Sequence, residues 1–275
     1  MINLLRSELY KLFKSKSFYI CCFICVIATI VVAFTYNFLQ NNMSPEMLEQ
    51  MNNAAISDKS SITSPNSLFT QKFNGQLFLS QSFTGNTLQI ILAVFVSLFV
   101  SSEFTTGTIK NIVAKGFTRF NVYFAKLIIV WVASILMMLI IPLTAVSIGT
   151  ILWGFGNAAS DLTKNIVVFF GLQILLCLAL SSLFVTISVV VRSNGASIAI
   201  NVCIIAFSSI LTALLDAILP EGKTISQYWI QNNIIDVSSF GLTAKQITRS
   251  LIISSSYLLI CVLGGFFIFQ KKDIK

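Results

Sequence analysis

Six long apolar runs, separated by shorter polar segments, dominate the pattern of this 275-residue chain. They cover approximately residues 18–39, 83–102, 123–153, 166–191, 198–219 and 251–269. At about 1.5 Å per residue, each run is long enough to cross a hydrocarbon core of about 30 Å. The pattern therefore predicts an all-α integral membrane protein with six transmembrane helices. The third run exceeds a straight crossing, so we expect that helix to tilt, to kink at Pro142 or to extend beyond the bilayer.

Basic residues are distributed unequally between the two sets of connecting segments. If the N-terminus is cytoplasmic, twelve of the 18 Lys and Arg residues fall in cytoplasmic segments and six in exterior ones. The acidic residues show the opposite bias, with three inside and seven outside. An excess of Lys and Arg near span ends marks the cytoplasmic side. An even number of spans then places both termini in the cytoplasm.

Residues 1–16 show an amphipathic pattern ahead of the first span. Apolar residues recur there at helical spacing: Ile2, Leu5, Leu9 and Leu12. The charged residues occupy other positions: Arg6, Glu8, Lys11 and Lys14. The pattern predicts an N-terminal amphipathic helix at the inner membrane interface, where Arg6, Lys11 and Lys14 meet the headgroups. The alternative is a merely basic flank of the first span.

The two large exterior segments differ in composition. Residues 40–82 are rich in Asn, Ser, Gln and Thr and too poor in apolar residues for a large core, so we expect an exterior loop. Residues 220–250 carry apolar side chains such as Tyr228, Trp229 and Ile234, which is unusual for a solvated loop. We therefore expect one or two short re-entrant helices there, a fold tolerated where protein buries the backbone.

Composition narrows the range of functions. The chain is 56% hydrophobic and 10% charged, with a mean hydropathy of +0.86, and it contains no His. The absence of His excludes His-based catalytic triads, His zinc sites and the HExxH pattern. Cys21, Cys22 and Cys25 have a metal-like spacing, but they fall within the first span and fit small apolar side chains better. We therefore predict no metal site and no catalytic residue.

The chain has a net charge of +8 and a few polar residues within its spans. Most of the excess charge lies beside span ends, where topology and anionic lipid headgroups account for it, so we predict no nucleic-acid partner. Asp216 and Asn201 are candidate pathway residues, because polar groups inside a membrane are often functional. The alternatives are a solvated helix end for Asp216 and hydrogen bonding between helices for Asn201. The Phe-rich spans favour an amphipathic or lipid-like cargo.

A charged segment, residues 102–121, connects the second and third apolar runs. Thr105 or Thr106 suits the start of a helix, and Gly116 suits its end. Three apolar residues share one face at helical spacing: Ile109, Ile112 and Val113. We therefore expect a short cytoplasmic helix with an apolar face that can bury against a partner. The alternative is a solvated loop whose basic residues only set topology.

Glu103 lies where the second apolar run ends, and we expect it to pair with Arg119 or Lys110. The run Glu103-Phe104-Thr105-Thr106-Gly107-Thr108-Ile109-Lys110-Asn111, followed by Gly116 and Arg119, resembles the cytoplasmic loop of ABC-2-type ABC transporter permeases. The basic N-terminal segment, the six spans and the semi-apolar segment between the last two spans also fit that family. Within it, the chain is similar to permeases of bacterial bacitracin- and lantibiotic-resistance exporters.

The resemblance implies that residues 1–275 form a single ABC-2-type transmembrane domain in the bacterial cytoplasmic membrane. It implies that the short helix docks on a separate ABC ATPase subunit, which works as a dimer and binds ATP and Mg²⁺. The residues that it places in the coupling region are Glu103, Phe104, Gly107, Thr108, Ile109, Ile112, Gly116 and Arg119. It further implies a second permease chain, identical or related, and an amphipathic peptide, antibiotic or lipid-like cargo, as in antimicrobial peptide resistance.

This chain has no nucleotide-binding loop of its own. Gly149 and Gly154 have the glycine spacing of that motif, but Phe155 stands in place of its lysine. We therefore expect the chain to bind no cofactor. The alternative function is a self-contained secondary transporter or channel subunit, which would usually show more charged residues within its spans or symmetric broken helices.

Overall fold

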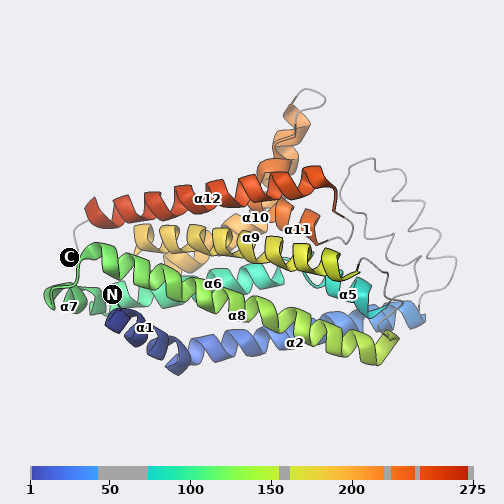
Figure 1. The fold of residues 1–275 in the computed structure, drawn as a ribbon, viewed down its shortest axis with the longest axis horizontal. Coiled ribbons are helices and arrows are strands. Elements are labelled where there is room, and N and C mark those ends of the chain that lie inside the picture. Colours follow the sequence, from blue (N-terminus) through green and yellow to red (C-terminus); the bar gives the residue numbers. More distant parts are fainter. Residues whose placement is uncertain (1, 43–73, 155–161, 220–223, 239–241, 272–275) are drawn as a thin grey trace.

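The computed structural model describes residues 2–42, 74–154, 162–219, 224–238 and 242–271. Figure 1 shows an elongated bundle whose long helices run roughly side by side, except α10, which crosses the others at a steep angle and ends outside the bundle. The helices are α1 (Ile2–Lys14), α2 (Lys16–Asn42), α5 (Gly75–Gln81), α6 (Thr87–Thr105), α7 (Thr108–Ala114), α8 (Arg119–Trp153), α9 (Leu162–Val191), α10 (Asn194–Ile218), η1 (Ser226–Tyr228), α11 (Ile230–Val237) and α12 (Ala244–Lys271). No strand occurs among these described residues.

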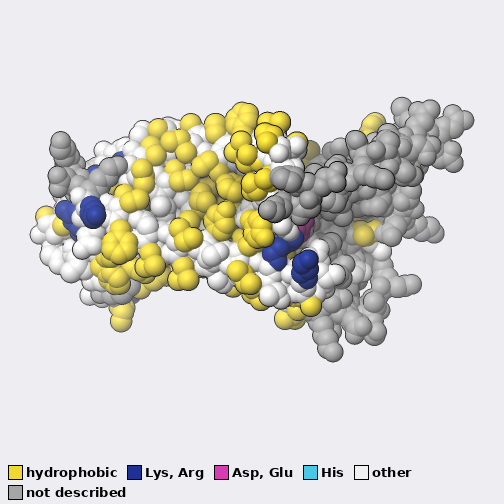
Figure 2. All heavy atoms as spheres, turned by 90° about the horizontal axis from the view of Figure 1, so that it is seen from above, with side chains coloured by type: hydrophobic (Ala, Val, Ile, Leu, Met, Phe, Trp, Pro, Cys, Tyr) yellow, Lys and Arg dark blue, Asp and Glu magenta, His cyan; other side chains and the backbone are white. Residues whose placement is uncertain are grey.

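Six of these helices are long and apolar enough to cross a membrane: α2, α6, α8, α9, α10 and α12. This confirms the predicted all-α, multi-pass fold. On the face drawn in Figure 2, hydrophobic side chains cover the middle, and Lys and Arg gather towards the two ends. Such an apolar belt with charges at its rims is what a bilayer requires.

One end of the bundle collects most of the described basic residues. It comprises α1, α7, the first turns of α8, the short turn between α9 and α10, and the last turn of α12 (Figure 1). The basic residues at this end are Arg6, Lys11, Lys14, Lys16, Lys110, Lys115, Arg119, Lys126, Arg192 and Lys271. The positive-inside rule predicts that this end, with both ends of the described chain, faces the cytoplasm.

The N-terminal segment folds as a helix of its own. The chain breaks at Ser15, so α1 ends at Lys14 and α2 begins at Lys16 at a different angle (Figure 1). Serine at such a junction is expected, because its side chain competes with the helical backbone for hydrogen bonds. The separate α1 can therefore lie beside the bundle instead of extending the first span.

Helix α8 has 35 residues and continues without interruption through Pro142. At about 1.5 Å per residue it is about 52 Å long, well over the bilayer core. Its outer end supports α5, a short helix within the predicted exterior loop of residues 40–82; the rest of that loop, residues 43–73, lies outside the described residues. Gly75 and Gly149 allow the close approach, and the Gly75 N–H donates to the Gly154 carbonyl at 2.8 Å.

The segment between α10 and α12 is structured and packed. Helix α11 contacts α9, α12 and α10 and buries Ile230, Ile234 and Val237. The Gln173 side chain of α9 donates to the Ile234 carbonyl at 2.9 Å, which satisfies a backbone group at a short helix end. A helix is thus present in the predicted re-entrant segment, while its depth in a bilayer stays a prediction.

Candidate functional site

Four charged side chains meet at the cytoplasmic end of the bundle, and we call them the charge cluster: Glu8, Lys11, Glu103 and Lys126. They come from α1, α6 and α8. Lys11 Nζ lies 2.5 Å from Glu8 Oε1 and 3.3 Å from Glu103 Oε1. Lys126 Nζ lies 3.5 Å from Glu8 Oε2 and pairs most closely with Glu103 Oε2. Each lysine therefore bridges both carboxylates, and the cluster joins the three helices.

The charge cluster is largely shielded from solvent. The side chains of Glu8 and Lys126 are 2% and 4% exposed, that of Glu103 is 11% exposed, and that of Lys11 is 39% exposed. Buried charges are tolerated only when they are paired. Two carboxylates and two ammonium groups satisfy this requirement with no net charge. Lys126 Nζ also lies 5.5 Å from the centre of the Phe99 ring, a cation–π contact.

Lys11 is the member of the cluster that reaches the protein surface. Burial by itself lowers the pKa of Lys11, but its hydrogen bond to Glu8 and the nearby charge of Glu103 outweigh burial and hold that pKa above its usual value. Lys11 therefore stays positively charged throughout the physiological pH range. The cluster is a permanent electrostatic link, and Lys11 is not a proton switch.

The burial of Glu8 changes the interpretation of α1. The stripe that faces the protein is Leu4, Glu8 and Leu12, at helical spacing of four residues. Ile2, Leu9 and Phe13 instead face outward. Of the apolar residues expected on one face, Ile2 and Leu9 are thus turned away from the bundle, where lipid would cover them, whereas Leu12 is buried in the bundle together with Glu8. The reason is that Lys126 of α8 pairs with the Glu8 carboxylate, and Lys11 of α1 pairs with it from the same helix.

The predicted partners of Glu103 are wrong. Glu103 pairs with Lys126 and Lys11 instead of Arg119 or Lys110. The Arg119 Nη1 atom donates to the Gln270 carbonyl at 2.8 Å, which ties the start of α8 to the end of α12. Lys110 is exposed on α7. Glu103 lies two residues before the end of α6, and its side chain is buried in the bundle instead of facing the loop.

Helix α7 occupies the predicted loop. Gly107 precedes it with φ +69, a left-handed conformation that glycine adopts without strain. Thr105 and Thr106 were expected to cap α7, but both hydroxyls donate back to the Ser102 carbonyl of α6. The Thr106 and Thr108 hydroxyls lie 2.9 Å apart across the turn. The connection between α6 and α7 is therefore short and closely hydrogen-bonded.

The apolar side of α7 faces the bundle. Ile109 is 1% exposed, and Ile112 and Val113 pack partly buried against the core. The outward side carries Lys110, Asn111, Ala114 and Lys115. The expectation that the apolar face is free for a partner is therefore not met, since the chain's own core covers it. What remains available on α7 is a polar, positively charged surface.

Two further predicted residues, Gly116 and Phe104, lie at the cytoplasmic end of the bundle next to α7. Gly116 has φ +87, and its N–H donates to the Val113 carbonyl at 3.0 Å, as expected of a left-handed helix stop. Phe104 lies between other helices: its ring centre is 6.2 Å from that of Phe269 on α12, and the Arg192 guanidinium lies 5.3 Å above it. Arg192, in the turn between α9 and α10, itself has φ +60. The cytoplasmic ends of α6, α9 and α12 thus meet at Phe104.

The other predicted residues are not part of α7 or of the charge cluster. Arg6 and Lys14 are exposed on α1, and Lys14 Nζ lies 5.6 Å from the centre of the Tyr10 ring. Asn201 is fully buried, and its amide donates to the Ser97 hydroxyl of α6 at 2.8 Å. Asp216 is half-buried near the outer end of α10, where it accepts the Ile225 N–H at 2.5 Å. Asn201 thus joins helices, and Asp216 holds the following turn.

Glu8 and Lys126 are the members of the charge cluster that the sequence analysis did not single out. Lys126 had a usable signal: it lies within the third apolar run, and a charge in a membrane span implies a buried partner. For Glu8 the periodicity was ambiguous. Leu4 and Leu12 flank it at a spacing of four residues, the same spacing that relates Leu5 and Leu9, so either set could form the buried face of the helix. Only the packing of α1 on α8 decides between them.

Comparison with known proteins places this chain in a family. A family model described as "Protein of unknown function (DUF2705)" matches residues 47–275. The chain belongs to the DUF2705 family. The matched region contains α5 to α12, and with them α7, Glu103 and Lys126.

A relative of this DUF2705 chain is the "Uncharacterized protein YhcI" of Bacillus subtilis (strain 168). The two sequences are 23% identical over 197 residues. The alignment covers 64% of this chain and 61% of the relative, so less than two thirds of either protein is matched.

Proposed function

We propose that this chain is the membrane-spanning permease subunit of an ATP-driven ABC exporter, and that a separate ABC ATPase subunit supplies ATP hydrolysis. One observation carries the proposal. Helix α7, with an outward positive surface, stands at the end of the bundle where α1, α6 and α8 are joined by buried ion pairs. A partner that moves α7 would move these helices with it, because packed helices shift as units.

The resemblance of residues 103–119 to the cytoplasmic loop of ABC-2-type permeases supplies the class of partner. The outward Lys110 and Lys115 suit an acidic groove, since charged groups at an interface set its register and its specificity. ATP and Mg²⁺ would bind to the partner. The same resemblance supports a second permease chain, identical or related, the bacterial cytoplasmic membrane as the location, and an amphipathic peptide, antibiotic or lipid-like cargo.

The charges of the spans favour this proposal over a self-contained transporter or channel. A proton- or ion-coupled carrier usually places ionisable side chains near the middle of the membrane. In the six spans, every Asp, Glu, Lys and Arg lies within about two turns of a helix end. Even the buried pair Glu103 and Lys126 is at the cytoplasmic end, where it can join helices but cannot relay ions across the bilayer.

The proposal is tested by purifying the tagged chain and measuring the amount of ATPase subunit that is recovered with it. The tagged chain should bring down a protein that contains the G-x-x-x-x-G-K-[ST] motif. The double substitution Lys110→Glu and Lys115→Glu should reduce that recovery at least roughly tenfold, since like charges across an interface cost several kcal/mol. Lys245→Glu is the matched control, because Lys245 is also exposed but lies at the opposite end of the bundle. Transport activity that persists with no nucleotide-binding partner would refute the proposal.

A further inference from the structure

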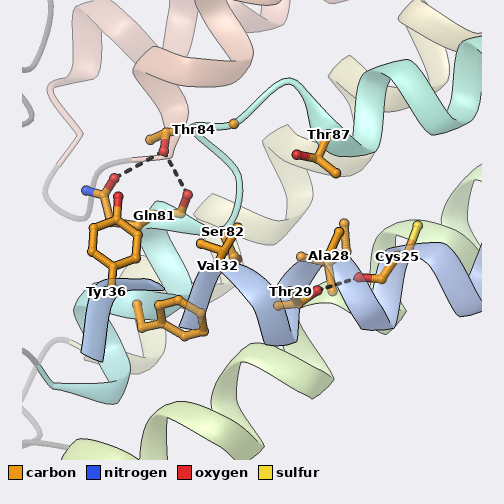
Figure 3. Close-up of a pocket in the computed structure, with 12 residues that line it drawn as sticks. Cys25, Ala28, Thr29, Val32, Tyr36, Gln81, Ser82, Thr84 and Thr87 are labelled. Atoms are coloured by element: carbon orange, nitrogen blue, oxygen red, sulfur yellow. Dashed lines mark hydrogen bonds between the residues drawn. The ribbon is translucent and has the colours of Figure 1, made fainter. Parts of the chain in front are cut away.

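A cavity lies in the outer half of the bundle, well away from the charge cluster. Its volume is ≈ 230 Å³, and it is bounded by α2, α5, the turn before α6, and α8 (Figure 3). Cys25, Phe78 and Ile141 form a buried floor, with exposed fractions of 0%, 0% and 4%. Val32 and Thr87, both exposed, stand at its mouth. The cavity therefore has a buried, mainly apolar base and is open at its side.

The polarity of the cavity changes along the membrane normal. Cys25 and Ala28 on α2 lie towards the middle of that span, whereas Tyr36 lies near its outer end. Cys25 and Tyr36 are eleven residues apart in sequence, which corresponds to about 16 Å along the helix. Tyr36 turns towards Gln81 and Thr84, so that hydroxyl and amide groups gather at the outer end (Figure 3).

The polar groups of the cavity are neutral and mostly fixed. The Thr84 hydroxyl donates to the Gln81 carbonyl at 2.7 Å and lies 3.1 Å from Gln81 Oε1, which holds this rim in place. Deeper in the cavity, the Thr29 hydroxyl donates to the Cys25 carbonyl at 2.6 Å, so that its polar atom is satisfied by its own helix. Among the described residues that line the cavity, none is Asp, Glu, Lys or Arg. Its chemistry therefore suits an uncharged group at the rim and hydrocarbon below.

We propose that this cavity binds one alkyl chain of an outer-leaflet amphipath, with an uncharged ester, amide or hydroxyl group of that molecule at the rim formed by Tyr36, Gln81 and Thr84. The direction of the polarity matches an outer-leaflet lipid, whose polar end lies outward and whose chain points to the midplane. The size limits the occupant, since an apolar cavity of about 150 Å³ holds one benzene. The cavity therefore takes part of one chain, and not a peptide or a whole lipid. The site does not depend on the proposed transport function.

Photolabelling in lipid nanodiscs tests this site on the full chain. The probe is a phospholipid with a diazirine in one acyl chain, and adducts are mapped by mass spectrometry. Adducts on residues 25–36 and 78–87 should exceed those on the lipid-facing side of α12, at Leu259 and Leu263. Ala28→Phe should lower the cavity adducts roughly tenfold. The larger side chain would fill part of the cavity, so a bound chain would overpack it, and the tenfold loss of binding corresponds to about 1.4 kcal/mol, within the usual cost of overpacking. Ile27→Phe, on the outward side of the same helix, is the matched control.

Two further arms make the test decisive. Thr87→Trp blocks the mouth at an exposed position, so it should reduce labelling even if Ala28→Phe does not fold. A monoacylglycerol with the same diazirine chain identifies the source: labelling by the phospholipid assigns the site to bulk lipid, and labelling by the monoacylglycerol alone assigns it to a scarcer single-chain amphipath. Cavity adducts no more frequent than those on α12, or unchanged in Thr87→Trp, would overturn the proposal.

Discussion

Lys126 holds a buried ammonium group between two carboxylates, and its exposed fraction of 4% leaves almost no room for water. Lys126→Met keeps the apolar stem but leaves Glu8 and Glu103 with Lys11 alone. We expect the free energy of unfolding in detergent to fall by about 3–5 kcal/mol, the usual cost of breaking a buried ion pair from one side. Lys115→Met, at an exposed position on the same end, should change it by less than about 0.5 kcal/mol.

A double-mutant cycle separates pairing from packing in the charge cluster. Glu103→Gln removes one of the two carboxylates that Lys126→Met leaves behind. If pairing sets the cost, the double variant should be more stable than Lys126→Met alone, and the two effects should not add. Strict additivity of the two losses of unfolding free energy would mean that the ion pairs contribute little, and that Lys126 matters only for its volume.

At the scale of the element, α12 contains two neighbouring glycines in different surroundings. A Cβ atom added at Gly265 would lie 2.3 Å from the Tyr123 hydroxyl and 2.8 Å from Thr186 Oγ1, while at Gly264 it would meet nothing within 4 Å. Tyr123 is 1% exposed, so it has little freedom to move away. Gly265→Ala should therefore lower stability by about 1–3 kcal/mol through overpacking. Gly264→Ala should raise it by about 0.5–1 kcal/mol, since alanine favours a helix.

Thermal unfolding in one detergent, with fluorescence and circular dichroism recorded together, compares these two alanine variants directly. The two glycines are adjacent on the same helix and receive the same substitution. The difference between the unfolding midpoints of the two variants therefore reports the contact of position 265 with Tyr123 and Thr186. Equal shifts for the two variants would show that α12 does not pack on α8 and α9 at Gly265 as described.

Short helices show where sequence reasoning fails. The periodicity of Ile109, Ile112 and Val113 correctly groups them on one face, because helical spacing is a local property. It does not reveal which body covers that face, and the chain's own core does so. The same limit applies to α1, where Glu8 belongs to the buried stripe. Long-range packing, and not local propensity, decides both cases.

At the scale of the whole molecule, the sequence was sufficient for the number of spans, their order and the all-α class. These follow from hydropathy and length, which no tertiary contact needs to supply. The charge cluster was not predictable as a unit, because it joins residues from three helices that are separated by up to 118 positions, from Glu8 to Lys126. Its pairing depends on how α1 lies against α8.

The orientation of the bundle is the prediction on which the site depends, because α7 can meet an ATPase only in the cytoplasm. Lys115, just after α7, and Asn42, at the far end of α2, are both exposed and lie at opposite ends of the bundle. Lys115→Cys should react with a membrane-impermeant maleimide only in inside-out vesicles, and Asn42→Cys only in intact cells, because the α2 span separates them by more than the ~30 Å core.

The unmodified chain sets the background for this labelling, since its own six cysteines lie within the spans, where such a reagent reacts poorly. Reaction of both variants from the same side would show that an even number of membrane crossings lies between Asn42 and Lys115, and would contradict the single crossing by α6. Reaction of Lys115→Cys only in intact cells would invert the bundle. In that case α7 and the charge cluster would face the exterior, ATP would be out of reach of any partner docked there, and the proposed coupling to an ATPase would fail while the six-helix fold remained.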